Sequence, residues 1–163
     1  MPTLGELMST LPQEGTVEWI GVRPARREAL DALDTVEATP EAGLAGDRYS
    51  KADGDRQVTL IQGEHLDAVG SMLGEGSIDP GRVRRNIVVR GINLLALKEK
   101  QFKVGDATLR YTGLCVPCSF MEENLGPGGY NAMRGHGGIT AAVVDGGTIS
   151  KGSSVLMVDS DDD

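Results

Sequence analysis

The stretch from Ala107 to Leu125 reads ATLRYTGLCVPCSFMEENL and contains both cysteines of the chain, Cys115 and Cys118. Its first residues, 107–111, are typical of a strand, and Ser119–Leu125 is typical of a short helix. A cysteine near the start of a helix feels the positive end of the helix dipole, which favours the thiolate. A thiolate attacks electrophiles, transfers sulfur or binds a soft metal, so this turn is a candidate reactive site. Two unreactive core thiols are the alternative, because free cysteine is often buried.

Short β-rich runs separated by glycines lie on both sides of this turn. Strands are predicted at residues 16–22, 36–39, 56–62, 86–90, 102–106, 107–112, 139–144 and 153–158. A helix is predicted over 64–73, where apolar residues recur at helical spacing before Gly74. Residues 126–138 are dominated by glycine. This pattern predicts a mainly β fold, a largely antiparallel barrel with a few short helices.

Length and composition predict one domain with an aliphatic core. The chain has 163 residues, of which 39% are hydrophobic, but it has only one Trp, two Phe and three Tyr. Val, Leu, Ile and Ala must therefore fill the interior. We expect a single domain over residues 1–163 with a core at about 16–158, followed by an acidic tail at 159–163.

The charge of the chain limits its partners. The formal net charge is −8, which disfavours nucleic acid because phosphate attraction supplies most of that affinity. No apolar run approaches the ~20 residues that cross a bilayer, and the first residues do not resemble a signal peptide. Two closely spaced cysteines without a secretory signal favour a reducing compartment. We therefore expect a cytoplasmic protein with no nucleic-acid or membrane partner.

Arginines are clustered just before the predicted strand 86–90 of this acidic chain. The cluster consists of Arg82, Arg84 and Arg85, with Arg90 at the end of the strand, and a separate loop holds Arg23, Arg26 and Arg27. Arginine is the side chain best shaped for bidentate contact with phosphate. The cluster predicts an anion site, and ordinary surface charge is the alternative.

The glycine-rich stretch Arg134–Gly138 contains one of the two histidines, His136. Glycines let backbone N–H groups approach a ligand, and a histidine can donate a proton or contact an anion near neutral pH. The stretch matches neither a Walker A loop nor a dinucleotide fingerprint. A zinc site of Cys115, Cys118, His136 and His65 is disfavoured because structural zinc ligands are grouped more tightly.

Several segments, in their order along the chain, resemble those of the MOSC domain family, which is related to the C-terminal domain of molybdenum cofactor sulfurase. The segments are Gly43–Arg48, Arg56–Ile61, Arg84–Ile87, Gly91–Leu94, Thr112–Cys118, Gly137–Ala141 and Gly147–Gly152. The resemblance covers roughly residues 16–158. It implies a mainly β fold, a closed β-barrel of the pyruvate-kinase-barrel type with a few flanking short helices.

The resemblance also implies a site. The thiolate of Cys118 would bind the molybdenum of a pterin cofactor, molybdopterin. The residues expected to hold the cofactor are Arg48, Arg56, Arg84, Arg85, Asn86, Thr112, Arg134 and Gly137. Cys118, Cys115 and His136 are the candidate catalytic residues. Pyridoxal phosphate binding is a further property that the resemblance suggests.

The chain departs from the family pattern at three places. Cys115 stands where the family often has Arg, which removes an anion contact and adds a thiol three residues from Cys118. Tyr49 stands where His is frequent. Gly152-Ser153 replaces a usual Gly-Asp in the closing hairpin, which affects a turn.

Two functions follow from the resemblance. The first is a molybdenum-dependent oxidoreductase that acts on small nitrogen compounds, served by a reductase partner. The second is a sulfur carrier in which Cys118 takes sulfur as a persulfide from a donor such as a cysteine desulfurase. Cys115 would then release the sulfur by forming a disulfide with Cys118.

Two alternatives to these functions are a different fold and a barrel without catalytic activity. Cys-x-x-Cys before a helix also occurs in thioredoxin-like proteins, but the residues after the motif look like β-hairpins instead of the expected strand-helix completion. A barrel that binds a ligand and performs no chemistry is the other alternative.

Overall fold

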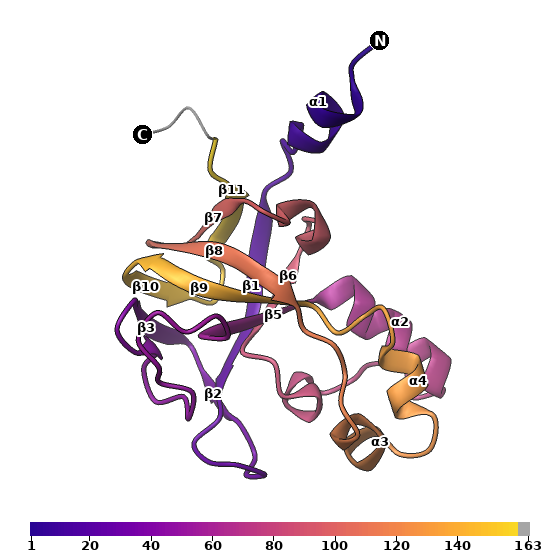
Figure 1. Cartoon of the computed structure of the whole chain (residues 1–163). Coiled ribbons are helices and arrows are strands. Elements are labelled where there is room, and N and C mark those ends of the chain that lie inside the picture. Colours follow the sequence, from indigo (N-terminus) through magenta and orange to yellow (C-terminus); the bar gives the residue numbers. More distant parts are fainter. Residues whose placement is uncertain (160–163) are drawn as a thin grey trace.

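Seven strands close into a barrel because the last strand of the chain pairs with the first. β11 (Ser154–Met157) runs antiparallel to both β1 (Gly15–Val22) and β7 (Gln101–Val104). The order around the barrel is β11-β7-β8-β9-β5-β6-β1 (Figure 1). The other four strands are β5 (Val58–Gln62), β6 (Ile87–Arg90), β8 (Ala107–Leu114) and β9 (Ile139–Asp145). The predicted closed, mainly β barrel is confirmed.

One pair of barrel strands is parallel, so the sheet is mixed instead of wholly antiparallel. β5 and β6 run in the same direction, and α2 (Gly63–Leu73) connects them. This crossover covers the outer face of β5, and all five residues of that strand are buried. β2 (Asp31–Leu33) extends the sheet beyond β1, and a small separate sheet contains β10 (Gly147–Ser150), β3 (Thr35–Thr39) and β4 (Gly43–Leu44).

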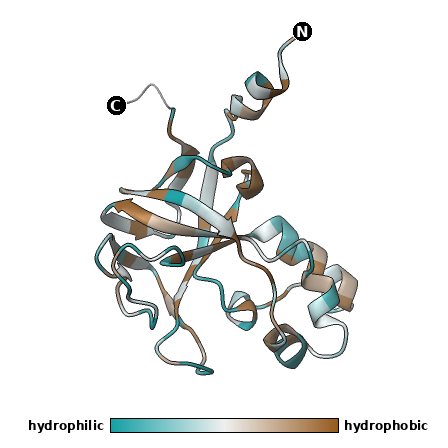
Figure 2. Ribbon diagram, viewed as in Figure 1, coloured by the Kyte–Doolittle hydropathy of each residue, from teal (hydrophilic) through white to brown (hydrophobic). Residues whose placement is uncertain are grey.

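Alternating side chains divide the interior into two cores. Inside the barrel, residues such as Ile20, Leu60 and Phe102 form an aliphatic core. Outside it, Ile61 of β5 and Val88 of β6 pack against the helices in a second core. Figure 2 shows hydrophobic segments on the strands and on the neighbouring helices, in agreement with these two cores.

Short helices lie together at one side of the barrel (Figure 1). They are α2, α3 (Phe120–Leu125), α4 (Gly129–Met133) and the 3-10 helix η1 (Pro80–Val83). A second 3-10 helix, η2 (Leu94–Leu97), follows β6, and α1 (Leu4–Ser9) stands apart from the barrel with no buried residue. The helix predicted over 64–73 is confirmed.

Helix α4 lies inside the glycine-rich stretch 126–138, where no helix was predicted. A Cβ at Gly129 would lie 2.5 Å from Leu125 Cβ and 2.8 Å from the Met121 carbonyl oxygen. The glycine therefore serves the close approach of α4 to α3. This helix shows that glycine content alone was a poor guide to the conformation of the stretch.

The computed structural model describes residues 1–159. The predicted acidic tail begins at Asp159, and its remaining residues lie outside the described part of the chain. Within residues 1–159, none of the helices is long and apolar enough to cross a membrane.

Candidate functional site

The two cysteines occupy different environments in the turn between β8 and α3. Both are free thiols, but Cys115 is only 2% exposed, whereas Cys118 is an exposed residue. The Cys115 amide donates to the Gly138 carbonyl at 2.9 Å, which ties the first cysteine to the barrel. The Cys118 carbonyl accepts from the Met121 amide at 2.9 Å, at the start of α3. Cys118 is therefore the thiol that a ligand or a partner reaches.

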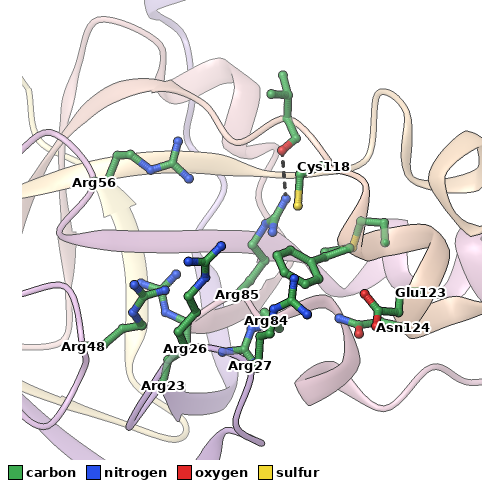
Figure 3. Close-up of a pocket in the computed structure, with 13 residues that line it drawn as sticks. Arg23, Arg26, Arg27, Arg48, Arg56, Arg84, Arg85, Cys118, Glu123 and Asn124 are labelled. Carbon is green, nitrogen blue, oxygen red and sulfur yellow. Dashed lines mark hydrogen bonds between the residues drawn. The ribbon is translucent and has the colours of Figure 1, made fainter.

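Cys118 lies at a pocket of about 280 Å³ that is lined mainly by arginines (Figure 3). The seven arginines are Arg23, Arg26, Arg27, Arg48, Arg56, Arg84 and Arg85. The other lining residues besides Cys118 are Val116, Phe120, Met121, Glu123 and Asn124. We call this site the arginine pocket. Three separate parts of the chain bring these guanidinium groups together: the loop after β1, the segment between β4 and β5, and the segment before β6.

Arg85 is buried beneath the cysteine turn and is bonded only to backbone. Its guanidinium donates to the carbonyls of Gly137 at 2.8 Å, Val83 at 3.1 Å and Cys115 at 3.1 Å. A longer bond of 3.5 Å to the Val116 carbonyl is drawn as a dashed line in Figure 3. Burial lowers the pKa of Arg85, and the neighbouring thiols of the turn, when ionised, act in the opposite direction. Arg85 thus places a cation beside the turn, and no carboxylate of residues 1–159 pairs with it.

Gly137 supports this arrangement through its lack of a side chain. A Cβ at this position would lie only 2.0 Å from the Cys115 carbonyl oxygen and 3.3 Å from an Arg85 nitrogen. The glycine-rich stretch therefore lies directly against the cysteine turn. The predicted ligand contact of Gly137 is not seen in the pocket lining, and its carbonyl positions Arg85 instead.

Asp47 organises the opposite side of the pocket. Its carboxylate accepts from the Arg23 backbone at 2.8 Å, from the Arg23 guanidinium at 2.8 and 3.1 Å, and from the Tyr49 amide at 3.1 Å. Burial by itself raises the pKa of Asp47, but the hydrogen bonds and charge of Arg23 outweigh it, so the pKa is lowered. Asp47 therefore holds Arg23 and neutralises part of the charge of the pocket.

Asn86 acts behind the pocket and not in its lining. The side chain is fully buried, accepts from Thr59 at 3.0 and 3.1 Å, and donates to the Gly21 carbonyl and to Asp47 at 3.0 and 3.2 Å. It connects β5, β1 and the Asp47 segment. The predicted cofactor contact of Asn86 is thus replaced by a positioning role.

The loop after β1 is held over the pocket by two contacts. The Arg84 guanidinium donates to the carbonyls of Glu28 and Ala25, the latter at 3.4 Å. The Arg27 guanidinium carbon lies 4.5 Å from the centroid of the Phe120 ring, which is a cation–π contact. Burial lowers the pKa of Arg84, and the positive charges of Arg23 and Arg48 act in the same direction.

The charge of the pocket is largely uncompensated by the protein. Arg26, Arg48 and Arg56 form no ion pair with any carboxylate among residues 1–159. Glu123 is the one carboxylate among the lining residues, against seven arginines. In a chain of net charge −8, this concentration of cations points to an anionic ligand.

Besides Cys115, Asn86 and Gly137, three more predicted site residues do not line the arginine pocket. The Thr112 hydroxyl lies 2.8 Å from the Thr140 hydroxyl and also donates to the Asp55 carbonyl. Arg134 is exposed at the end of α4.

The third is His136. Its ring packs against that of His65, with centroids 5.0 Å apart, and its Nδ1 lies 3.0 Å from the Ala132 carbonyl. Burial, followed by the charge of His136, lowers the pKa of His65. The histidine pair therefore joins α2 to the end of α4, and neither histidine lines the arginine pocket.

Eight lining residues were not among the predicted site residues. They are Arg23, Arg26, Arg27, Val116, Phe120, Met121, Glu123 and Asn124. The three arginines in one loop of an acidic chain were a visible signal, but their distance in sequence from the cysteine turn concealed the connection. Phe120, Glu123 and Asn124 follow Cys118 on α3, so the helix brings them to the same pocket.

The chemistry of the lining indicates which bound groups suit the site. One soft thiol beside several guanidinium groups fits an anionic cofactor whose metal takes a sulfur ligand. Residues 1–159 contain no cluster of three or more His, Cys, Asp or Glu that could hold a metal. A metal here would therefore need most of its donors from its own organic ligand. Pyridoxal phosphate fits less well, because no lysine lines the pocket to form a Schiff base.

The comparisons with known proteins agree with this architecture. A family model for the MOSC domain matches residues 37–156. No curated protein matches the chain in sequence. The structure is similar to that of YuaD from Bacillus subtilis, with a TM-score of 0.76 and 16% identity over 90% of this chain and 97% of that one.

Two further structures are similar to this one. YiiM from Geobacillus stearothermophilus has a TM-score of 0.69 and 16% identity over 89% of this chain and 75% of that one. YiiM from Escherichia coli has a TM-score of 0.68 and 18% identity over 91% and 72% of the two chains. At these identities the likeness concerns the fold. Because the family model covers most of the barrel, the chain belongs to the MOSC domain family.

Proposed function

We propose that this protein is an oxidoreductase that binds molybdenum cofactor through Cys118 and acts on small nitrogen compounds. The observation that carries the proposal is the exposed Cys118 thiol at a pocket with seven arginines. A thiolate is a suitable ligand for a soft metal, and guanidinium groups suit the phosphate and oxygens of a pterin. Membership of the MOSC family supports this assignment, because the family is associated with that cofactor.

Residues with free guanidinium groups would hold the anionic part of the cofactor. Arg26, Arg48 and Arg56 are the first candidates, because no carboxylate of residues 1–159 occupies them. Arg85 has a different task, since backbone carbonyls use its donors. Its hydrogen bonds to the Cys115 and Val116 carbonyls fix the turn that carries the sulfur.

The bound cofactor would supply the two-electron chemistry of oxygen-atom transfer. The chain itself would orient the sulfur of Cys118, with Phe120 and Met121 as apolar neighbours in the lining. Glu123 is the carboxylate of the lining, and reduction of a nitrogen–oxygen group consumes protons. Glu123 would be the side chain of the lining that relays such protons from water to the substrate.

The experiment is metal analysis of protein produced in a host with an intact pterin pathway. We expect stoichiometric molybdenum in the wild type and in Cys115→Ala, and loss of the metal in Cys118→Ser. Reduction of an N-hydroxylated compound should follow the metal content across the three proteins. Wild-type protein that lacks molybdenum and stays inactive after cofactor is supplied would exclude this function.

A second function is favoured by the open side of Cys118. The residue also lines an outer hollow with Pro117, Ser119, Glu122, Tyr130 and Asn131, from which another protein can reach the sulfur. As a sulfur carrier, the Cys118 thiolate attacks the outer sulfur of a desulfurase persulfide. A Cys118 persulfide forms, and the desulfurase thiolate leaves.

The buried position of Cys115 changes one part of this hypothesis. At 2% exposure the Cys115 thiol is shielded from solvent, so we expect an external thiol to release the sulfur from Cys118. Mass spectrometry after incubation with a cysteine desulfurase and cysteine tests the carrier. A gain of one sulfur at Cys118 is expected, and an equal gain in Cys118→Ala would exclude the carrier.

A further inference from the structure

The arginine pocket adjoins a second hollow, of about 430 Å³, through three residues that line both. The shared residues are Arg27, Arg84 and Asn124. Beyond them the second hollow is lined by Trp19, Ala32, Asp79 and Arg82, among others. We call it the tryptophan hollow. The two cavities therefore border on each other at these three residues.

We propose that the tryptophan hollow binds the base of a nucleotide whose diphosphate lies on Arg27 and Arg84. The inference rests on the proposed function in one respect: if the pterin cofactor binds at Cys118, the nucleotide would be an extension of that cofactor. The binding itself requires no metal and no reaction. It is argued from Trp19, from the two shared arginines and from the polar groups of the hollow.

Trp19 provides a fixed aromatic surface. The pairing of β1 with β6 shifts its register between Val17 and Trp19, and such a bulge re-aims the side chains that follow. The indole ring lies against Gly21, where a Cβ would come within 2.1 Å of the ring. One part of the ring packs on the second core, and another part lines the hollow. A supported indole of this kind is suited to stacking on a planar base.

The two shared arginines have unusual backbone conformations and restrained side chains. Arg27 and Arg84 have φ values of 66° and 57°, and they are two of only four non-glycine residues with positive φ within residues 1–159. Such conformations are strained, and they persist where the surrounding structure fixes them, frequently at binding sites. Arg84 is further fixed by its bonds to the Ala25 and Glu28 carbonyls, and Arg27 by its contact with Phe120. Two fixed guanidinium groups between the cavities match a diphosphate.

Polar groups at the edge of the hollow suit the rim of a base. The Asp79 carboxylate accepts from the Gly81 amide at 3.1 Å through Oδ1. A carboxylate has further acceptor sites for the N–H groups of a base. Asn124 is fixed by bonds with Arg82 in both directions, at 3.1 and 3.3 Å. The hollow thus offers a stacking surface, a cationic border and a hydrogen-bond acceptor.

The test is a titration of the purified chain, without added cofactor, with GDP, with ADP and with pyrophosphate. Trp19 is the only tryptophan, so its fluorescence reports on the hollow directly. We expect the nucleoside diphosphates to quench it and to bind roughly tenfold more tightly than pyrophosphate, as one stacked base predicts. Pyrophosphate should bind without quenching. Equal affinities for the three probes, or unchanged fluorescence with GDP and ADP, would overturn the proposal.

Variants of the two cavities distinguish binding of the base from binding of the phosphates. The same three probes are titrated, and calorimetry measures their affinities. Trp19→Leu should lose the roughly tenfold preference and keep its affinity for pyrophosphate. If Trp19→Leu does not fold, Ala32→Leu, on the exposed strand β2, fills part of the hollow and should lower the same preference. Arg27→Gln should weaken all three probes, whereas Arg134→Gln, a matched change outside both cavities, should weaken none. If Trp19→Leu or Ala32→Leu folds and still prefers nucleoside diphosphates to pyrophosphate as strongly as the wild type, base binding is contradicted.

The outcome is independent of the molybdenum assignment. Cys118→Ser should lose the metal but retain the Trp19 response to GDP and ADP. Wild-type protein that holds molybdenum but does not distinguish GDP from pyrophosphate would overturn the nucleotide site alone. Mild acid treatment of the holoprotein identifies the source. A nucleoside monophosphate released in proportion to molybdenum assigns the nucleotide to the cofactor, and an intact diphosphate released without metal supports the site with a free nucleotide.

Discussion

The two ends of strand β6 carry arginines in opposite situations. Arg85, just before the strand, is buried, and its guanidinium donates only to backbone carbonyls. Arg90, at the end of the strand, lies at the surface and pairs with Glu18 at 2.7 Å and Asp67 at 2.8 Å. Both belong to the same short run of sequence. The difference teaches that an arginine cluster in the sequence does not define a site, because its carboxylate partners decide which charges remain for a ligand.

Replacement of Arg85 should have the largest effect on this comparison. Arg85→Met leaves the carbonyls of Gly137, Val83 and Cys115 buried without their donor, so we expect the free energy of unfolding to fall by about 3 kcal/mol. Urea denaturation followed by circular dichroism measures the change, with Arg134→Met as the matched control. A loss similar to that of the control would mean that these carbonyls find other donors.

The Asp47 side of the pocket should come next. Asp47→Asn removes the partner of Arg23, and we expect a loss of about 2 kcal/mol near neutral pH. Because the pKa of Asp47 is lowered in the folded protein, its contribution is present above the ordinary value of 3.8 and disappears as the pH falls through the lowered pKa.

The pH dependence gives this prediction a sharper form. Urea unfolding of both proteins should show a constant difference from about pH 7 to about pH 4 and a shrinking difference as the pH is lowered further toward about 2. A difference that stays constant down to about pH 2 would show that the ionised carboxylate is not what stabilises the segment.

An arginine without a carboxylate partner should affect binding and not stability. Arg56→Gln is expected to weaken pyrophosphate binding roughly fivefold to tenfold, as the loss of one charge-assisted contact predicts. Its unfolding free energy should stay within about 0.5 kcal/mol of the wild type. Calorimetric titration measures the first quantity and urea denaturation the second. Equal binding by Arg56→Gln and Arg134→Gln would remove Arg56 from the site.

The smallest effect should come from the paired end of β6. Arg90→Gln loses two exposed ion pairs, for which we expect at most about 1 kcal/mol of unfolding free energy. That loss should diminish at high salt, and pyrophosphate binding should not change. Denaturation at low and high ionic strength makes the measurement. A salt-independent loss would indicate that packing of the Arg90 side chain stabilises β6, since Gly63 approaches that side chain closely.

Most of the fold could be predicted from local patterns. The runs at 16–22, 56–62 and 139–144 have the β-rich composition of strands, and the structure has the strands Gly15–Val22, Val58–Gln62 and Ile139–Asp145 there. Helix α4 was not predicted because its glycine, Gly129, looked like a sign of a loop. The structure shows that a glycine is needed there for the close contact with α3. The short strands β2 and β4 carry no pattern of their own and exist through pairing with β1 and β3.

The candidate site was predictable in its sulfur and only partly in its charges. Cys118, Arg48, Arg56, Arg84 and Arg85 were predicted and are brought to one pocket. Arg134 and His136 were grouped with them because glycines surround them, but their side chains lie at the end of α4 and beside His65.

By itself, the sequence determined where most strands lie along the chain, the aliphatic composition of the core and the single turn that carries both thiols. These features depend on residues that are neighbours along the chain. Only the tertiary structure decided which thiol faces outward and which arginines surround it. Barrel closure brings the loop after β1, the Asp47 segment and the residues before β6 to one place, and carboxylates elsewhere pair with Arg90 and Arg82. The physical reason is that charge balance is set by distances in space, which composition and spacing along the chain do not contain.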